Sequence, residues 1–217
     1  DIDGNIIKAS KSVKLLGLRI DQKLNFDLHI KGLCKTATRN INALRIIFHL
    51  IPYDNGKILF STFFESSFGY CPLLWMFSNK GSNNELRKIH KRGLRLLTDK
   101  PKATYDELLD ETGSVTMHTR NLQLLMVEMY KTTHKLNPQF MWDLLEKKDT
   151  EHDLRVNNLL KLPTIKTKTH GLRSFTFRGS IMWNYLPNEL KNCKTLKIFK
   201  KKIKGWRGEK CKCKLCV

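Results

Sequence analysis

The chain has 217 residues, with 40 Lys and Arg against 20 Asp and Glu, and its formal net charge of +20 favours a polyanionic partner, nucleic acid first. No apolar run is long enough to cross a bilayer, and the first residues have neither the basic start nor the apolar core of a signal peptide, so we expect an intracellular protein without a disulfide framework. A basic membrane-surface protein is the weaker alternative, because the lysines are not confined to the polar face of one amphipathic helix.

The positive charge is concentrated in the last part of the chain. From Leu154 onward, 17 Lys and Arg stand against two acids, Glu189 and Glu209. We expect three segments: a β segment over residues 1–24, a helical thumb-like domain over 25–148 and an irregular basic region over 149–217. The expected fold class is therefore mainly α, a helical bundle with a small antiparallel β-sheet remnant at the N-terminus.

The segment from Val13 to Asp21 alternates as an extended chain does, and we predict one strand there. Gly17 lies in its middle, where the missing side chain would let a backbone or ligand approach closely. The turn residues Asp3-Gly4-Asn5 suggest a second extended piece before it, and hence a small antiparallel sheet.

Apolar residues at three- and four-residue steps predict a long helix from Asp27 to Pro52, with Asn25 as its cap. Away from the apolar face, Lys31, Lys35 and Arg39 form one row with Asn42. Such a row can follow a sugar-phosphate backbone, and an ordinary solvated face is the alternative.

A second helix after Asp54 is apolar almost all round and is predicted to be core. The capping-box spacing of Ser82 and Glu85 predicts the start of a third helix. Its outer side carries five cations with almost no acidic partner, and we expect phosphate contacts at this face. They are Arg87, Lys88, Lys91, Arg92 and Arg95.

The middle of the chain predicts helices rather than a catalytic or metal site. Thr104 and Glu107 have capping-box spacing, and the acids that follow suit the first turn of a helix. His118 and His134 lie too far apart on one predicted helix to bind the same ion. Residues 159–180 are predicted to be irregular or β-like, and 181–187 a short helix.

The last predicted helix has a clear division into two faces. Leu196, Phe199, Ile203 and Trp206 follow core spacing, so we expect the tryptophan to pack rather than to stack on bases. The lysines of the other face suit sequence-independent phosphate binding, or a nuclear-localisation-like basic run. The binding candidates are Lys197, Lys200, Lys201 and Lys204.

Three cysteines close the chain, Cys211, Cys213 and Cys216, with flanking lysines that favour thiolates. Zn²⁺ prefers four such soft ligands in a tetrahedron, and the fourth is missing locally. It could be Cys193, His170, a residue outside the chain or a thiol of a partner. An unstructured reduced tail is the alternative to a zinc site.

Short blocks along nearly the whole chain share a pattern with one family. They are residues 13–21 with 23–26 and 29–30, Tyr70–Trp75, His90–Arg95, His118–Gln123, Trp183–Pro187 and the cysteine tail. In this order they resemble the end of the palm, the thumb and the C-terminal region of reverse transcriptases from non-LTR (jockey-type) retrotransposons. The family carries similar C-terminal cysteines.

The resemblance implies the C-terminal part of an RNA-directed DNA polymerase. Leu16 and Gly17 match the primer-grip strand, so RNA and DNA as template and primer are the implied partners, with an upstream palm and fingers. The implied location is the nucleus or a cytoplasmic ribonucleoprotein.

Polymerase chemistry in that family needs paired aspartates that hold Mg²⁺, and this chain has no adjacent Asp-Asp. We therefore expect this chain alone to be inactive as a polymerase. One alternative is a free-standing basic helical binding module, whose N-terminal strands should then be satisfied within the chain. A metal-dependent enzyme that uses the acidic cluster around Asp106 or the cysteines ranks last.

Overall fold

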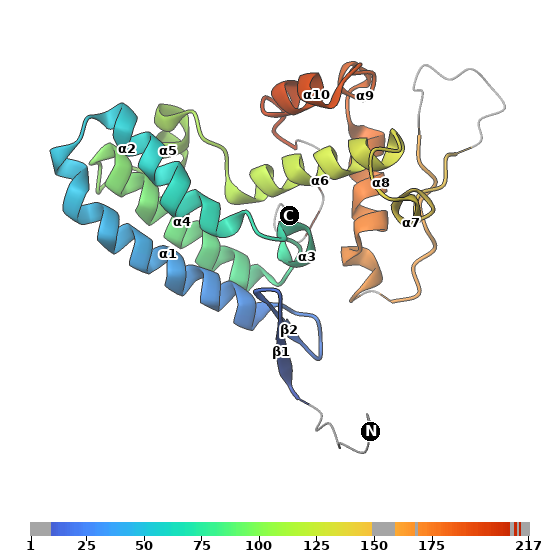
Figure 1. Ribbon diagram of the computed structural model, residues 1–217, viewed down its shortest axis with the longest axis horizontal. Coiled ribbons are helices and arrows are strands. Elements are labelled where there is room, and N and C mark those ends of the chain that lie inside the picture. The colour runs from blue at the N-terminus through green and yellow to red at the C-terminus, as the bar shows by residue number, and fades with distance from the viewer. Residues whose placement is uncertain (1–9, 149–158, 168, 209–210, 212, 214–217) are drawn as a thin grey trace. The chain divides into compact units, whose positions relative to one another are not determined.

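The computed structural model describes residues 10–148, 159–167, 169–208, 211 and 213. Figure 1 shows a mainly helical chain with a two-stranded antiparallel sheet near the N-terminus, which confirms the expected fold class. The chain forms two compact units, one of residues 1–71 and 78–102 and one of residues 72–77 and 103–217. No helix in the described part has the length and apolarity to cross a membrane. The Asp3-Gly4-Asn5 turn and Cys216 lie outside the described residues.

The first unit opens with a β-hairpin, whereas one continuous strand was predicted. Strand β1 is Ser12–Leu15 and β2 is Leu18–Asp21, with Leu15 opposite Leu18. The backbone φ angles of Leu16 and Gly17 are 46° and 91°, and positive φ at both positions is what a tight two-residue hairpin loop requires. The single-strand prediction was wrong because a chain cannot remain extended through two such residues. The Tyr70 hydroxyl donates a hydrogen bond to the Leu16 carbonyl at this turn.

Helix α1 (Asp27–Ile47) continues into a 3-10 turn, η1 (Phe48–Leu50), and confirms the predicted long helix. Its cap is not Asn25: Phe26 occupies the N-cap position in a left-handed conformation, without a side-chain cap. The Asp21 carboxylate instead accepts the backbone amides of Lys23, Asn25 and Phe26 at 3.0, 3.2 and 2.8 Å. Burial opposes ionisation of this carboxyl, but the backbone hydrogen bonds prevail and lower the pKa of Asp21.

Helix α2 (Tyr53–Leu59) leads through a π-helical turn, η2 (Phe60–Phe64), into the 3-10 helix η3 (Glu65–Phe68). Pro52, not Asp54, is the N-cap residue of α2. Phe60, Phe64 and Phe68 are buried, but Ile58 and Phe63 are 64% and 55% exposed. The prediction that this segment is core all round was therefore wrong for one face, because α1 and α4 cover only the other.

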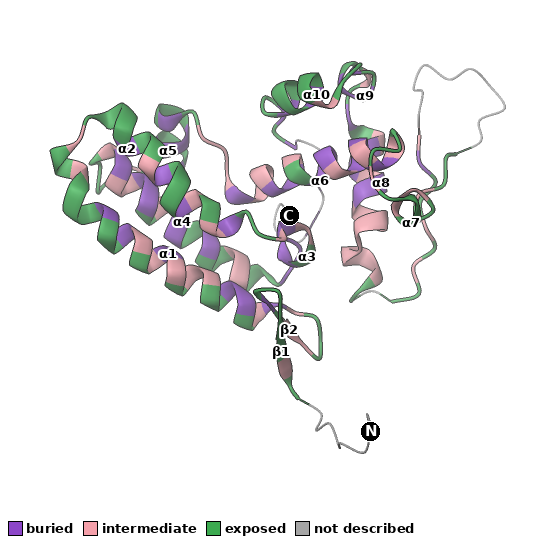
Figure 2. Cartoon of the chain, in the orientation of Figure 1, coloured by how far each residue is buried: buried purple, intermediate pink, exposed green. Residues whose placement is uncertain are grey.

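Helix α4 (Lys80–Thr98) packs along α1, and both helices alternate buried and exposed residues in Figure 2. Asn79 caps α4 by accepting the Ser82 amide at 2.8 Å, so the helix starts earlier than the predicted Ser82 box. Gly93 lies so close to the Phe60 and Phe64 rings that an added Cβ would be 2.9 Å from them. Its missing side chain lets the aromatic segment pack against α4.

The second unit contains the remaining helices. Their bounds are α3 (Pro72–Trp75), α5 (Tyr105–Thr112), α6 (Met117–Thr133), α7 (Gln139–Trp142), η4 (Gly171–Arg173), α8 (Phe175–Tyr185), α9 (Asn188–Lys191) and α10 (Leu196–Ile203). The capping box of Thr104 and Glu107 is confirmed at the start of α5. Helix α6 lies at the centre of the core of this unit and contacts α3, α8 and α10.

The C-terminal region is less irregular than predicted, because residues 175–180 are helical. The Ser174 side chain caps α8 by accepting the Phe177 amide at 3.2 Å. Gly179 then lets α8 approach α6, since an added Cβ would be 2.4 Å from the Met129 sulfur. The alternation of Phe175 and Phe177 is too short to indicate a strand. The Ser174 cap and the close contact at Gly179 favour a helix instead.

Candidate functional site

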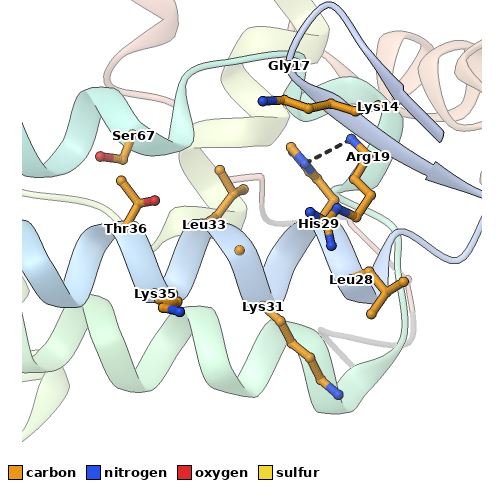
Figure 3. Close-up of a pocket in the computed structure, with 11 residues that line it drawn as sticks. Lys14, Gly17, Arg19, Leu28, His29, Lys31, Leu33, Lys35, Thr36 and Ser67 are labelled. Carbon is orange, nitrogen blue, oxygen red and sulfur yellow. Dashed lines mark hydrogen bonds between the residues drawn. The ribbon is translucent and has the colours of Figure 1, made fainter. Parts of the chain in front are cut away.

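A pocket of about 580 Å³ lies between the hairpin and α1 in the first unit. Four of its lining side chains are cationic, and none is acidic. Figure 3 shows Lys14, Arg19 and His29 close together near the turn, with Lys31 and Lys35 along α1. The complete lining is Lys14, Gly17, Arg19, Leu28, His29, Lys31, Gly32, Leu33, Lys35, Thr36 and Ser67.

The hairpin register places two cations side by side. Lys14 on β1 is directly opposite Arg19 on β2. The backbone amide of Arg19 donates to the Nδ1 atom of His29 at 3.4 Å and so points away from β1. Lys14 and Arg19 therefore form a non-hydrogen-bonded pair, the kind in which opposing side chains are closest. Like charges in this position are destabilising, so the pair favours an anion between or near its members.

His29 forms the floor of this arrangement and is buried, with 6% of its surface exposed. Burial lowers the pKa of His29, and the positive charge of Arg19 lowers it further. A ring whose Nδ1 atom accepts a hydrogen bond carries its proton on Nε2. His29 is therefore a neutral positioning group at pH 7, and the four cations supply the charge of the pocket.

The structure brings together only part of the sequence-predicted α1 and primer-grip residues. Gly17, Lys31 and Lys35 line the pocket. Leu16 is 84% exposed at the tip of the hairpin and does not line it. Arg39 lies one turn beyond Lys35, exposed, with its guanidinium donating to the Thr36 hydroxyl at 3.3 Å.

The α4 cations form a second row next to the first. Arg87, Lys88 and Arg92 are exposed and the other two, Lys91 and Arg95, are half-buried. Lys88 forms an ion pair with Glu85 at 3.0 Å, so one member of the row has an acidic partner. The spacing of three residues on one helix makes that pair possible.

The four lysines predicted on the last helix, Lys197, Lys200, Lys201 and Lys204, are all exposed around α10 in the second unit. Phe199 and Ile203 are buried on the opposite face, as predicted. Trp206 is 7% exposed and belongs to the core of this unit, which confirms that it packs.

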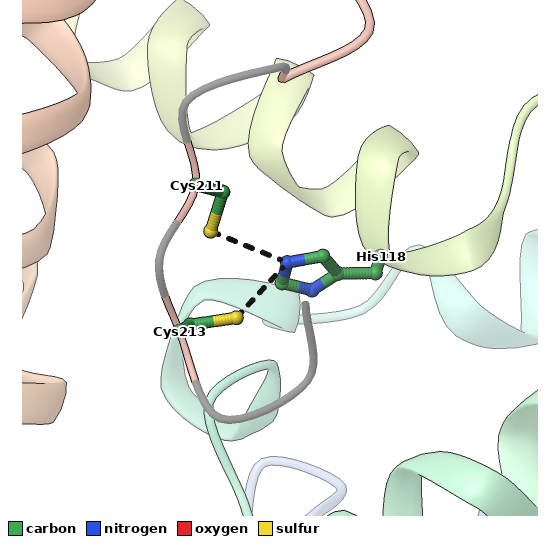
Figure 4. A group of neighbouring side chains, drawn as sticks. All are labelled: His118, Cys211 and Cys213. Carbon is green, nitrogen blue, oxygen red and sulfur yellow. Dashed lines mark hydrogen bonds between the residues drawn. The ribbon is translucent and has the colours of Figure 1, made fainter. Parts of the chain in front are cut away.

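A separate group of possible metal ligands also lies in the second unit. The Nε2 atom of His118 is 3.6 Å from the Cys211 sulfur and 3.3 Å from the Cys213 sulfur, and Figure 4 shows both sulfur atoms pointing at the ring. The three ligand atoms lie within 4.8 Å of one another. Among the residues that the structure describes, Cys193 and His170 do not join this group, and the Cys193 thiol donates to the Glu189 carbonyl instead.

Sequence reasoning missed four of these residues: Lys14, Arg19, His29 and His118. Lys14 and Arg19 could be predicted as neighbours only if Leu16-Gly17 is assigned as a two-residue loop, because that loop places position 14 opposite position 19. His118 has no second histidine within ligand reach on its own helix, so helical spacing does not predict it as a ligand. Its proximity to cysteines more than 90 positions later arises from the path of the tail, for which local sequence gives no signal.

Comparisons with known proteins supply no family for this chain. No protein-family model, curated protein or solved structure matches it.

Proposed function

We propose that the first unit binds the sugar-phosphate backbone of nucleic acid, with the cation-lined pocket between the hairpin and α1 as its main contact. The observation that carries this proposal is the convergence of Lys14, Arg19, Lys31 and Lys35 on one pocket without an acidic lining residue. Phosphate oxygens are the ligands that such a set of ammonium and guanidinium groups prefers.

The cost of assembling these charges supports an anionic ligand. Lys14 and Arg19 oppose each other across the hairpin, and Lys31 and Lys35 lie four residues apart on one helix, where like charges repel. Within the described residues, no carboxylate forms an ion pair with any of the four. A bound phosphate would remove this repulsion and release counterions.

The extent of the charged surface favours a polymer over a small anion. Lys31 to Arg39 spans about 12 Å at 1.5 Å per helical residue. The surface then continues from Asn42 of α1 to Arg92 of α4, which are joined by a hydrogen bond of 3.1 Å. A row of this length contacts successive phosphates and carries no base-reading pattern, so binding should be indifferent to sequence.

We further propose that the chain is the C-terminal part of an RNA-directed DNA polymerase of a non-LTR retrotransposon, gripping template and primer. The hairpin supports this reading: Val13, Leu15 and Leu16 are 58%, 58% and 84% exposed, and the described sheet has two strands. Such a hairpin is marginal by itself, and strands of an upstream palm would cover its apolar residues. The Mg²⁺-binding aspartates would belong to that palm.

A free-standing binding module is the alternative proposal. It shares the pocket and predicts the same RNA and DNA binding, but it needs the hairpin to be covered within the chain. Measured binding to a separately purified palm and fingers fragment distinguishes the two, since only the polymerase part should bind it.

Binding to RNA and DNA tests the main proposal. We expect replacement of Lys14, Arg19, Lys31 and Lys35 by Gln to weaken binding of a labelled 20-nucleotide RNA at least about 100-fold at low salt, as four phosphate contacts are lost. Fluorescence anisotropy measures the affinity.

A control variant removes the same charge from the same unit. Arg45, Lys57, Lys100 and Lys102 are exposed and do not line the pocket. If their replacement by Gln weakens binding as much as the pocket variant does, net charge rather than the pocket determines affinity, and the proposal fails.

A further inference from the structure

We propose that His118, Cys211 and Cys213 bind one Zn²⁺ ion, which fixes the C-terminal tail to the start of α6. His118 is the second residue of α6, and the two cysteines come from the tail after α10. The proposal concerns the second unit alone and is independent of nucleic-acid binding by the first.

The distances fit a tetrahedral zinc site. Zn–S bonds of about 2.3 Å and Zn–N bonds of about 2.0–2.1 Å at a tetrahedral angle place the sulfur and nitrogen ligands about 3.5 Å apart. The observed Nε2 to Sγ distances are 3.3 and 3.6 Å. The described residues thus offer three of the four ligands of such a site, with both nitrogen-to-sulfur distances at ligand spacing and all three atoms within 4.8 Å of one another.

The Nε2 atom of His118 is the common neighbour of both sulfur atoms. A metal ion on the Nε2 lone pair would have both thiolates beside it as further ligands. Imidazole with two thiolates is a donor set typical of Zn²⁺, whereas Mg²⁺ and Ca²⁺ prefer oxygen ligands.

The surrounding contacts hold the tail at this position. The Gln123 side chain on α6 donates to the Lys204 and Trp206 carbonyls at 3.1 and 2.8 Å. Gly208 turns the chain with φ of 72°, and an added Cβ would be 2.8 Å from a Leu122 methyl group. Glycine is thus required for the tail to pass this close to α6.

Burial and ring packing complete the site. Cys211 and Cys213 are 8% and 3% exposed, so both residues are largely shielded from water. The Phe77 ring lies edge-on to the His118 ring, with centroids 6.3 Å apart, and restricts its rotation. Protected, oriented ligands of this kind are typical of a structural metal site.

Metal content and Co²⁺ spectroscopy test the proposal on the full chain. We expect one Zn²⁺ per chain after purification with a reductant and without chelator. Co²⁺ replacement should produce thiolate-to-metal charge-transfer bands together with the intense visible bands of tetrahedral Co²⁺. A chain that retains no zinc and gives no thiolate bands with Co²⁺ would overturn the proposal.

Matched variants identify the ligands. His118→Ala and Cys213→Ser should each lower Zn²⁺ affinity more than about 10-fold in chelator competition, the least that even outer-shell changes cost. His118→Cys should keep the metal, because thiolate replaces imidazole as a ligand, so it also separates ligation from folding. Cys34→Ser and Cys193→Ser, whose sulfur atoms lie outside the group, should keep it too. Unchanged affinity in a folded His118→Ala chain would contradict the assignment.

Discussion

The Arg92 guanidinium on α4 donates a hydrogen bond to the Asn42 side chain on α1 at 3.1 Å. Asn42 ends the row that begins with Lys31, so this bond joins two cationic helix faces into one continuous surface. Both rows were predicted from helical spacing, but their contact was not.

The α4 row should contribute to binding through the counterions that its cations release from the nucleic acid. We expect the triple variant with Arg87, Lys91 and Arg92 replaced by Gln to lower the slope of log affinity against log salt by about 2 for RNA. Lys88→Gln should change it less, because Lys88 already pairs with Glu85. Salt titrations of anisotropy measure both slopes. An unchanged slope in the triple variant would remove α4 from the binding surface.

Leu16→Asn should stabilise the hairpin. Leu16 has φ of 46° and is 84% exposed, so it has an unfavourable backbone conformation and little burial to lose. Asn tolerates this conformation, and Asn-Gly is the favoured two-residue hairpin loop, so we expect a gain of about 1 kcal/mol. Urea unfolding measures it. Leu15→Asn, on the extended strand, is the control and should give no gain; equal gains would refute the turn argument.

Lys191→Met should raise the stability of the second unit. Lys191 is 1% exposed, its Nζ atom donates to the Asn184 carbonyl at 3.2 Å, and burial lowers its pKa. The free-energy penalty for burying this charge is complete below the lowered pKa of the folded state, and it is lost as pH rises from there past the unfolded pKa of about 10.4. We expect the melting temperature at pH 7 to rise by about 2–4 °C, as for a gain of about 1 kcal/mol. Exposed Lys194→Met should leave it unchanged, and a lower melting temperature for Lys191→Met would contradict the argument.

His29 should make the first unit less stable in mild acid. Burial and the Arg19 charge lower its pKa in the folded state, so its contribution to stability is complete above the unfolded pKa of about 6.5 and is lost as pH falls toward the folded value. His29→Asn should remove part of the loss between pH 7 and 5. Unfolding at several pH values measures this, with exposed His49→Asn as control. The same pH dependence in wild type and His29→Asn would be contrary to this assignment.

Much of the helical structure could be predicted from the sequence. Periodicity located α1, α4 and α10, and spacing assigned Phe199 and Ile203 to the core and the neighbouring lysines to the surface. These predictions succeed because an amphipathic pattern over several turns is a repeated local signal.

The pocket and the cysteine group could not be predicted in the same way. Leu16 is a poor turn residue, so the loop that aligns Lys14 with Arg19 had no local signature. His118 meets Cys211 where Gln123 and Gly208 pack the tail against α6. Such contacts depend on tertiary structure, and a single sequence does not reveal them.

The salt dependence of RNA binding by the pocket variant tests the central claim most directly. Wild type and the variant with Lys14, Arg19, Lys31 and Lys35 replaced by Gln are titrated with the same RNA between about 50 and 200 mM salt, the range over which counterion release changes affinity strongly. We expect a slope lower by about 3 in the variant, since single strands release about 0.7 counterions per contact. Equal slopes for the two proteins would show that these four cations do not contact phosphate.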